Sequence, residues 1–309
     1  MKIQSHSGKA EAGFTLIEMA IVLVVIGLIV GGVLVGQNLI TAAEVRATIT
    51  QVEKYNTAAN TFRGKFNALP GDLNAQVATQ FGFTARGTFP GQGDGNGIIE
   101  GYNNATNTPI AQTGGETALF WVDLTYANGM NLNLIEGGFT IATIWPVGTV
   151  PITGLSKFFP QAKMGRGNYV YVFSGGVGGG DGNNYFGIAA ITSINSYMPI
   201  STPNVTAQEA YSIDSKVDDG LPQSGNVKAV YMNDSPPWGP INSVHWASGA
   251  SGVDGANSGS PNYGATTSAT PGSSTTCYDN GNATGATQQY SLGQNNGAGP
   301  NCALTFKFQ

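Results

Sequence analysis

The hydrophobic pattern divides the first 66 residues into two halves. From Phe14 to Gly36 the chain is apolar, and its only charge is Glu18. About 20 such residues in a helix, rising ~1.5 Å each, span the ~30 Å hydrocarbon core of a bilayer. A carboxylate within such a span costs ~2.5–3.5 kcal/mol on insertion scales, so a cationic partner is expected. The pattern therefore predicts a membrane-spanning helix over residues 14–36 with one charge that needs a partner.

The second half continues the helix in an amphipathic form. Apolar residues recur there at steps of three or four, which places them on one face. No proline interrupts the pattern before Pro70, which ends it together with Gly71. We expect one helix of roughly 50 residues, apolar over 14–36 and amphipathic over 37–66. Its buried face would consist of Val45, Ile49, Val52, Tyr55, Ala59, Phe62 and Phe66.

The pattern after the helix is that of an α+β domain, expected over residues 67–247. Thr117–Leu124 reads as a short helix, and four later segments read as strands. Each strand candidate is rich in β-branched or aromatic residues and is bounded by Gly, Asn or Pro, which favours an antiparallel sheet packed on the amphipathic helix. In the last one Thr305 and Lys307 would face outward from a half-buried strand. The candidates are Tyr169–Phe173, Tyr185–Ile191, Val227–Met232 and Leu304–Phe308.

Residues 248–309 are dominated by Gly, Ser, Thr and Asn. Such a stretch buries too little apolar surface to offset its ordering entropy, so we expect a long exposed loop before the terminal strand. The two cysteines of the chain, Cys277 and Cys302, lie here, and a disulfide between them is expected in an exported protein. It would close a loop of about 25 residues and contribute on the order of 3 kcal/mol. The alternative is a pair of free buried thiols.

Composition argues against two classes of function. Charged residues make up 10% of the chain, Gly numbers 45 and the net charge is −5, whereas intracellular enzymes carry more charge. Without a basic cluster, no nucleic-acid partner is expected. Apart from His6, which precedes the apolar segment, only His245 could act as a base at neutral pH. No Gly-x-Ser-x-Gly elbow accompanies it, and the glycine run at 175–180 lacks a Lys-Ser/Thr ending, so we expect no enzyme.

Two acidic clusters could bind a hard cation, with structural calcium as the possible cofactor. The first resembles half of a calcium loop, with oxygen-bearing side chains alternating around Gly97. It departs from the EF-hand pattern, because Gln92 and Asn103 would take the first and twelfth positions and two carboxylates are lost. The alternative is a glycine-rich turn. The candidate ligands are Asp94, Asn96 and Glu100.

The second acidic cluster consists of Asp214, Asp218 and Asp219. Asp214 and Asp218 would share a face if this segment is helical, which would suit a hard cation. The alternative is a turn, in which the Asp side chains accept hydrogen bonds from nearby backbone and Gly220 takes a positive φ.

The residues around Glu18 resemble a known export signal. Lys9-Ala10-Glu11-Ala12-Gly13 followed by Phe14-Thr15-Leu16-Ile17-Glu18-Met19 is similar to the class III signal of type IV pilins and type II secretion pseudopilins. The resemblance implies that a prepilin peptidase cleaves after Gly13, removes residues 1–13 as a leader and methylates Phe14. It also implies that Glu18 is an assembly carboxylate, paired with the N-terminal amine of a neighbouring subunit.

The apolar segment fits two simpler classes of N-terminal segment less well. An ordinary secretory signal has a 7–15-residue apolar core followed by a small-residue cleavage site, and here the core is longer and the small residue precedes it. A plain membrane anchor fits the hydropathy but accounts neither for Glu18 nor for the Gly13-Phe14 junction.

The resemblance implies a pilin-like fold and a structural subunit of a type IV pilus or type II secretion pseudopilus. Its partners would be other pilin or pseudopilin subunits through the N-terminal helix, the prepilin peptidase, the inner-membrane assembly platform and, before assembly, membrane lipid. The domain would first be periplasmic on a single-pass anchor in the bacterial inner membrane, and later part of a periplasmic pseudopilus or an extracellular pilus. A head of this size favours a minor pilin or pseudopilin. The alternative is a membrane-tethered adhesin or ligand-binding domain that forms no filament.

Overall fold

The computed structural model describes residues 14–87, 91–101, 114–125, 134–140, 149–174, 182–195, 198–233, 244–247, 276–279, 287–293 and 297–308. Over these residues the protein is α+β, with a long N-terminal helix and antiparallel sheets, as expected. The chain divides into two units, one up to Ala43 and one from Glu44 onward, and each is described by itself.

The first unit contains the apolar beginning of helix α1 (Leu16–Phe66). Every residue from Phe14 to Val35 is exposed, and the side chain of Leu16 is 88% exposed. Among the described residues, α1 is the one helix long and apolar enough to cross a membrane. Because so much contiguous apolar surface is unfavourable in water, this segment requires lipid or other apolar helices around it.

From Glu44 onward α1 belongs to the second unit, and there it buries one face. The expected face is confirmed except at Ile49, which is only partly buried against the core. Two polar residues, Thr48 and Gln51, are buried on this face as well. The Gln51 amide donates to the Gln161 carbonyl and accepts from the Lys163 N–H, each at 2.8 Å, and so fixes the helix to the 161–163 segment. The buried residues are Val45, Thr48, Gln51, Val52, Tyr55, Ala58, Ala59, Phe62 and Phe66.

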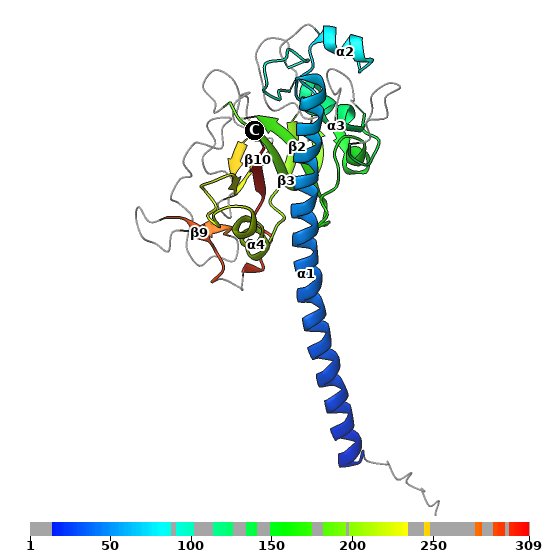
Figure 1. Ribbon diagram of the computed structural model, residues 1–309. Coiled ribbons are helices and arrows are strands. Elements are labelled where there is room, and N and C mark those ends of the chain that lie inside the picture. The colour runs from blue at the N-terminus through cyan, green and yellow to red at the C-terminus, as the bar shows by residue number, and fades with distance from the viewer. Residues whose placement is uncertain are drawn as a thin grey trace, which may run out of the picture. The chain divides into compact units, whose positions relative to one another are not determined.

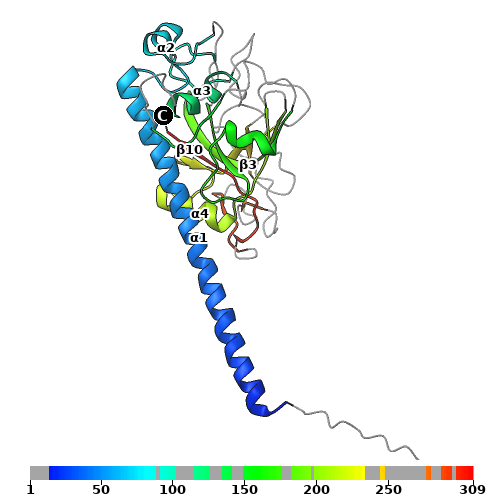
Figure 2. The same cartoon turned by 90° about the vertical axis from the view of Figure 1, so that its right-hand side faces the viewer.

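Strand β3 (Asn184–Asn195) is the centre of a six-stranded antiparallel sheet. Its first half pairs with two strands on opposite edges, β2 (Asn168–Ser174) and β10 (Leu304–Lys307). Its second half pairs with β1 (Thr149–Pro151) and β4 (Met198–Thr202), and the register of the β4 pairing shifts between Ile191 and Ser193. Strand β5 (Val227–Lys228) extends the sheet from β10. Figures 1 and 2 show the second half of α1 lying along this sheet.

The remaining elements surround the sheet. They are α2 (Ala75–Phe81), α3 (Gly115–Thr125), the 3₁₀ helix Ile152–Lys157, α4 (Ala207–Val217) and two small hairpin-like sheets. One pairs β6 (Val230–Met232) with β7 (Val244–Trp246), and the other pairs β8 (Tyr278–Asp279) with β9 (Gln289–Tyr290). Helices α2 and α3 lie near the C-terminal end of α1 in both ribbon views.

The strand predictions for β2, β3 and β10 are confirmed, and two details of the strand pattern need correction. The segment Val227–Met232 is two strands, because β5 pairs with β10 while β6 turns to pair with β7. Thr305 is fully buried rather than outward-facing, since its hydroxyl donates to the Val230 carbonyl at 3.0 Å. The terminal strand is therefore covered at Thr305, and only Lys307 faces water.

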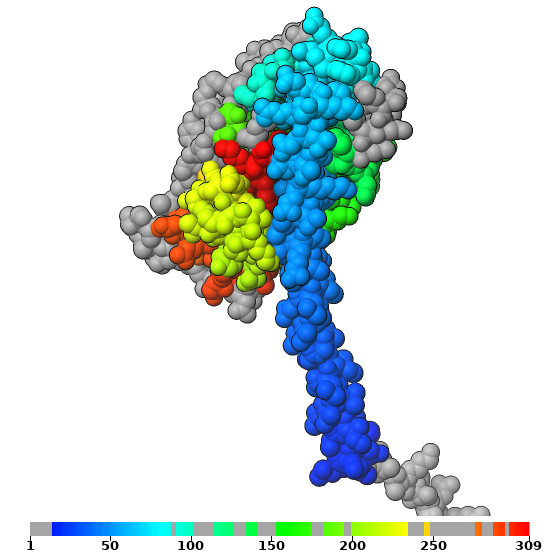
Figure 3. All heavy atoms as spheres, viewed as in Figure 1, coloured from blue at the N-terminus to red at the C-terminus, as the bar shows by residue number. Residues whose placement is uncertain are grey.

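An aromatic cluster joins helix, sheet and chain end. Tyr55 of α1 lies 5.1 Å from Trp121 of α3 and 6.2 Å from Phe186 of β3, measured between ring centroids. Phe186 also stacks on Phe308 at 4.2 Å and contacts Phe120 at 5.8 Å. In Figure 3 the C-terminal strand is visible as a red surface beside α1. Burial of these rings contributes to fixing α1 to the sheet.

Candidate functional site

The start of α1 carries the charged group that the sequence singled out. Thr15 caps the helix, and its hydroxyl and backbone N–H both donate to Glu18 Oε2 at 2.8 Å. The Glu18 N–H donates in return to the Thr15 hydroxyl at 3.3 Å. This reciprocal pair is a capping box, which satisfies two of the otherwise unpaired donors at a helix start.

The capping box gives Glu18 a local role at the helix start. The pattern Thr15-x-x-Glu18 is the signature of such a box, but the sequence prediction did not include it. The second oxygen, Oε1, makes none of the hydrogen bonds in this box, so a cation can approach it without breaking the cap. Phe14 is 80% exposed at the helix start. Gly13 lies outside the described residues. The geometry leaves Glu18 both a helix-capping residue and an accessible carboxylate on an apolar surface.

The first acidic cluster is assembled from three separate segments. Asp72 follows α1, Asp94 lies in a glycine-rich loop, and Glu116 lies in the first turn of α3. One carboxylate oxygen from each lies within 4.8 Å of the other two. Asp72 and Glu116 are buried, whereas Asp94 is exposed. Sequence reasoning found Asp94 but missed Asp72 and Glu116, because only folding brings them to the loop.

Loop amides surround two of these carboxylates. Asp72 accepts from the N–H groups of Gly95 at 2.7 Å and Gly97 at 2.8 Å. Glu116 accepts from the N–H groups of Gly93 and Glu100, each at 2.9 Å. Gly93 has φ +96°, and a Cβ there would collide with the Leu73 carbonyl oxygen, so the close approach requires glycine.

Glu100 is buried in the same loop without such support. It is fully buried, and neither of its carboxylate oxygens has a hydrogen-bond partner within the described part of the chain. Burial, and next the negative charge of Asp94, raise the pKa of Glu100 to about 7. The nearby Asn96 side chain opposes this rise, although the hydrogen bond of its NH₂ group goes to Asp94 Oδ2. Burial likewise raises the pKa of Asp72 to about 6, and it holds the pKa of Glu116 well above its usual range.

Asn96, the third predicted ligand, serves the turn itself. Its side-chain oxygen accepts from the Ile98 N–H at 2.7 Å, and its NH₂ group donates to Asp94 Oδ2 at 3.1 Å. Of the two positions at which the loop departs from the EF-hand pattern, Gln92 is buried and Asn103 lies outside the described residues.

The second acidic cluster spans the last turn of α4 and the turn after it, and each predicted ligand accepts hydrogen bonds from nearby groups of the protein. One oxygen from each of Asp214, Asp218 and Asp219 lies within 4.8 Å of the others. Asp214 accepts from the Gly220 N–H and the Tyr290 hydroxyl, and Asp218 accepts from the Asn226 and Val227 N–H groups. Asp219 accepts from the Leu221 N–H and the Ser224 hydroxyl. Gly220 has φ +76°, as a turn requires.

Helix α4 itself was not predicted beyond the segment around Asp214. Its signal is Thr206-x-x-Glu209, which forms a capping box in which the Glu209 N–H donates to the Thr206 hydroxyl at 3.2 Å. Only the last turn of α4 overlaps the acidic cluster, so Asp214 lies in the helix and Asp218 is its C-cap.

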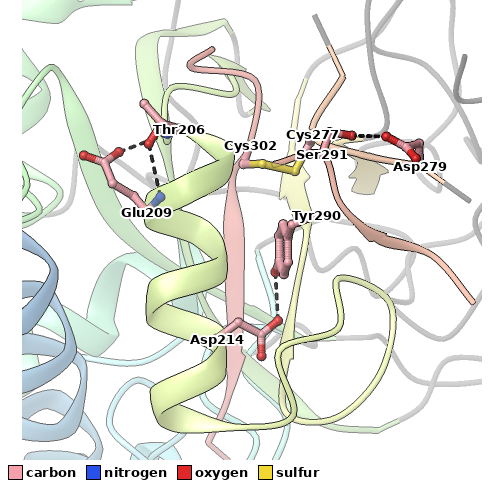
Figure 4. Close-up of a disulfide and its surroundings, with 8 residues drawn as sticks. All are labelled: Thr206, Glu209, Asp214, Cys277, Asp279, Tyr290, Ser291 and Cys302. Atoms are coloured by element: carbon pink, nitrogen blue, oxygen red, sulfur yellow. Dashed lines mark hydrogen bonds between the residues drawn. A yellow bond between two sulfur atoms is a disulfide. The ribbon is translucent and has the colours of Figure 1, made fainter. Parts of the chain in front are cut away.

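A disulfide joins Cys277 and Cys302, and both residues are fully buried. Cys302 pairs with Val205 through two backbone hydrogen bonds of 2.8 Å, directly before α4. Figure 4 shows the disulfide beside α4, with the Tyr290 hydroxyl pointing to Asp214 at 2.8 Å. Most of residues 248–300, expected to form an exposed loop, lies outside the described residues. The described pieces contain β8 and β9 and contribute Tyr278 and Tyr290 to the core.

His245 does not line the cavity beside α1. His245 is fully buried in β7, with Nε2 3.2 Å from the Asn233 carbonyl oxygen. A cavity of about 600 Å³ lies between α1 and residues 136–139 and 156–163. Its lining includes Arg46, Lys54 and Lys163 but neither His nor Cys. The glycine run at 175–180 lies outside the described residues.

Comparison with known proteins identifies the N-terminal signal. Residues 8–34 match the family model of the prokaryotic N-terminal methylation motif, the prepilin-type signal of type IV pilins and pseudopilins. No curated protein and no solved structure matches the chain. The match covers Gly13, Phe14 and Glu18, together with most of the apolar helix segment. With the uncovered apolar surface of α1, it marks a membrane-anchored protein with a pilin-like or pseudopilin-like role, of a class that is typically structural.

Proposed function

We propose that the protein is a filament-forming structural subunit, assembled through the N-terminal part of α1. The observation that carries the proposal is the uncovered apolar surface from Phe14 to Val35, which bears a single carboxylate next to a prepilin-type cleavage site. Before assembly, lipid of the bacterial inner membrane would cover this surface, with the head in the periplasm. In a filament, equivalent helices of other subunits would cover it.

The chemistry of Glu18 supports a role in registry. Cleavage after Gly13 would create an α-amino group on Phe14, close to the exposed start of the helix. A neighbouring subunit's amine would meet Glu18 in an apolar filament core, where an unpaired charge is costly. Pairing would therefore favour the one axial offset between subunits that brings amine and carboxylate together.

The size of the head favours a low-copy subunit. The chain from Glu44 onward forms a compact unit that comprises most of the 309 residues, and repeated copies of so large a head would crowd a filament. We therefore propose a minor pilin or a pseudopilin. Immunogold labelling of native filaments tests this proposal: labelling at tips or sparse positions is expected, and labelling only on the cell envelope would favour the tethered adhesin instead.

Substituting Glu18 should separate its two roles. Glu18→Ala removes both the cap and the charge, whereas Glu18→Gln keeps a side-chain oxygen that can accept the Thr15 hydrogen bonds. Because registry depends on charge, we expect both variants to be cleaved normally and to enter no filaments, as measured by immunoblotting of cells and of sheared filaments. Glu53→Gln, an exposed carboxylate elsewhere on α1, is the control and should assemble. If the Glu18→Gln variant enters filaments normally, the charge of Glu18 is not needed for assembly and its role is confined to capping the helix.

Substituting Gly13 tests the processing step separately. A bulky side chain before the scissile bond, as in Gly13→Val, should prevent cleavage by the peptidase. Our proposal requires this cleavage before assembly. The uncut chain would retain residues 1–13, so we expect a slower band on a denaturing gel and a mass that includes the leader. A band at the mature position would contradict cleavage at Gly13.

A further inference from the structure

The assembly function leaves the first acidic cluster unused. Asp72, Asp94 and Glu116 bring one carboxylate each from three chain segments to the same place, within 4.8 Å of one another, and Glu100 follows Asp94 in the same glycine-rich loop. The negative charges of Asp94 and Asp72 add to the rise in the pKa of Glu100, and they also add to the rise in the pKa of Glu116. The guanidinium of Arg86, which also reaches the segment after α1, bonds to Asp123 and to the Leu73 and Thr84 carbonyls instead.

The dimensions of the cluster suit a divalent cation. Oxygens of Asp72, Asp94 and Glu116 lie within 4.8 Å of one another. Two ligands on opposite sides of a calcium ion, each at ~2.4 Å, are separated by about the same distance. The backbone amides that donate to Asp72 and Glu116 occupy only part of their capacity, because each carboxylate offers about four lone-pair sites.

Glu100 provides an independent indication of a ligand. A carboxylate that is fully buried and accepts no hydrogen bond within the described residues is costly, unless a proton or a cation neutralises it. Asp72 and Glu116, in contrast, are each surrounded by loop amides. Glu100 is tied to the cluster through its backbone, since its N–H donates to Glu116 at 2.9 Å and its carbonyl accepts from the Glu116 N–H at 3.0 Å.

We propose that Asp72, Asp94, Glu100 and Glu116 together bind one calcium ion. The donor set is all oxygen, with neither His nor Cys, which disfavours zinc and softer metals. The ligands lie on loops and at a helix start, and calcium accepts the irregular geometry of six to eight oxygens that such segments offer, whereas magnesium demands an octahedron. Asp94 is exposed and provides a route for the ion from solvent.

Bound calcium would stabilise the end of the head that packs on α1. The ion would join the segment after α1, the glycine-rich loop and the first turn of α3. Phe120 and Trp121 of the same helix α3 belong to the aromatic cluster around Tyr55. Calcium should therefore raise the unfolding temperature of the head, and the effect is independent of filament assembly.

The test uses the full-length protein in detergent micelles, stripped with EDTA. Isothermal titration with CaCl₂ should give one site per chain, and tryptophan fluorescence should record a higher Tm with calcium than with the same concentration of MgCl₂. Glu100→Gln should weaken calcium binding by about tenfold or more. In EDTA it should be at least as stable as the wild type, because it removes an unpaired buried charge. That second readout distinguishes a lost ligand from a misfolded variant.

Asp219→Asn is the matched control, because it alters the other acidic cluster, and it should bind calcium as the wild type does. Three outcomes would overturn the proposal. One is the lack of both heat and a Tm change up to ~10 mM CaCl₂, the weak end of known calcium modules. Another is unchanged affinity in Glu100→Gln. The third is a loss of binding in Asp219→Asn, which would place the ion after α4. None of these outcomes bears on the Glu18 experiment.

Discussion

Replacing Arg86 by Met should destabilise the head by roughly 3–5 kcal/mol, the range for breaking a buried ion pair by removing one partner. Arg86 and Asp123 form a salt bridge of 2.6 Å, with side chains 0% and 1% exposed. Met preserves much of the apolar stem but leaves the Asp123 carboxylate buried, with the Gly71 N–H, at 2.7 Å, as its one remaining donor within the described part of the chain. The same guanidinium donates to the carbonyls of Leu73 and Thr84, which would also lose their partner.

The expected loss follows from the position of the pair. Burial raises the pKa of Asp123, and the adjacent Arg86 charge opposes that rise, so removing Arg86 leaves a buried carboxylate without its compensating cation. Urea unfolding of the full-length protein, followed by tryptophan fluorescence, measures the change, since Trp121 is fully buried two residues from Asp123.

Lys54→Met is the control, because it removes the cation of an exposed ion pair rather than of a buried one. Lys54 and Glu136 are 3.4 Å apart, but their side chains are 49% and 92% exposed, and exposed pairs contribute ~0–1 kcal/mol. A loss in Arg86→Met no larger than in Lys54→Met would contradict a structural role for the buried pair. The double variant Arg86→Met, Asp123→Leu should recover part of the loss, because it removes both charges.

Removing the disulfide should cost on the order of 3 kcal/mol, the chain-entropy value for a separation of 25 residues. The double variant Cys277→Ala, Cys302→Ala should therefore unfold at a lower urea concentration than the oxidised wild type. Both sulfur atoms are buried, and Cys302 pairs with Val205 at the start of α4. The crosslink thus restrains β8 and β9 against that helix.

Reduction of the wild-type protein provides the comparison that separates crosslinking from packing. The reduced wild type retains both sulfur atoms, so it should lose the crosslink contribution and keep most of the packing. A reduced wild type as stable as the oxidised form would contradict the expected contribution of the crosslink. If the double variant is much less stable than the reduced wild type, the difference in unfolding free energy comes from the cavity left by the two truncated side chains.

The regular elements were readable from the sequence because local patterns encode them. The period of three or four residues predicted the buried face of α1, and β-branched and aromatic runs located β2, β3 and β10. Predictions were wrong where a long-range partner decides. Thr305 is buried because the Val230 carbonyl accepts its hydroxyl, and the segment 227–232 is divided because β6 pairs with β7.

The candidate sites divide in the same way. The capping boxes at Thr15 and Thr206 are local Thr-x-x-Glu patterns, so the sequence contains the signal for both. The buried Gln51 carried no local signal, because its partners are the backbone groups of Gln161 and Lys163 more than a hundred residues away. Polar residues in a core can be placed only when their partners are known.

The sequence by itself determined the prepilin-type signal, the apolar segment with Glu18 and the helical pattern to Phe66, because each depends on contiguous residues and fixed periods. It also predicted Asp94, Asn96 and Glu100 as candidate cation ligands of the first acidic cluster. Only the tertiary structure decided that the carboxylates of Asp72 and Glu116 lie beside that of Asp94, that Asp214, Asp218 and Asp219 accept hydrogen bonds at the end of α4, and that Arg86 pairs with Asp123. Those groups are brought together by chain segments distant in sequence, and no local pattern records which carboxylates share a buried loop.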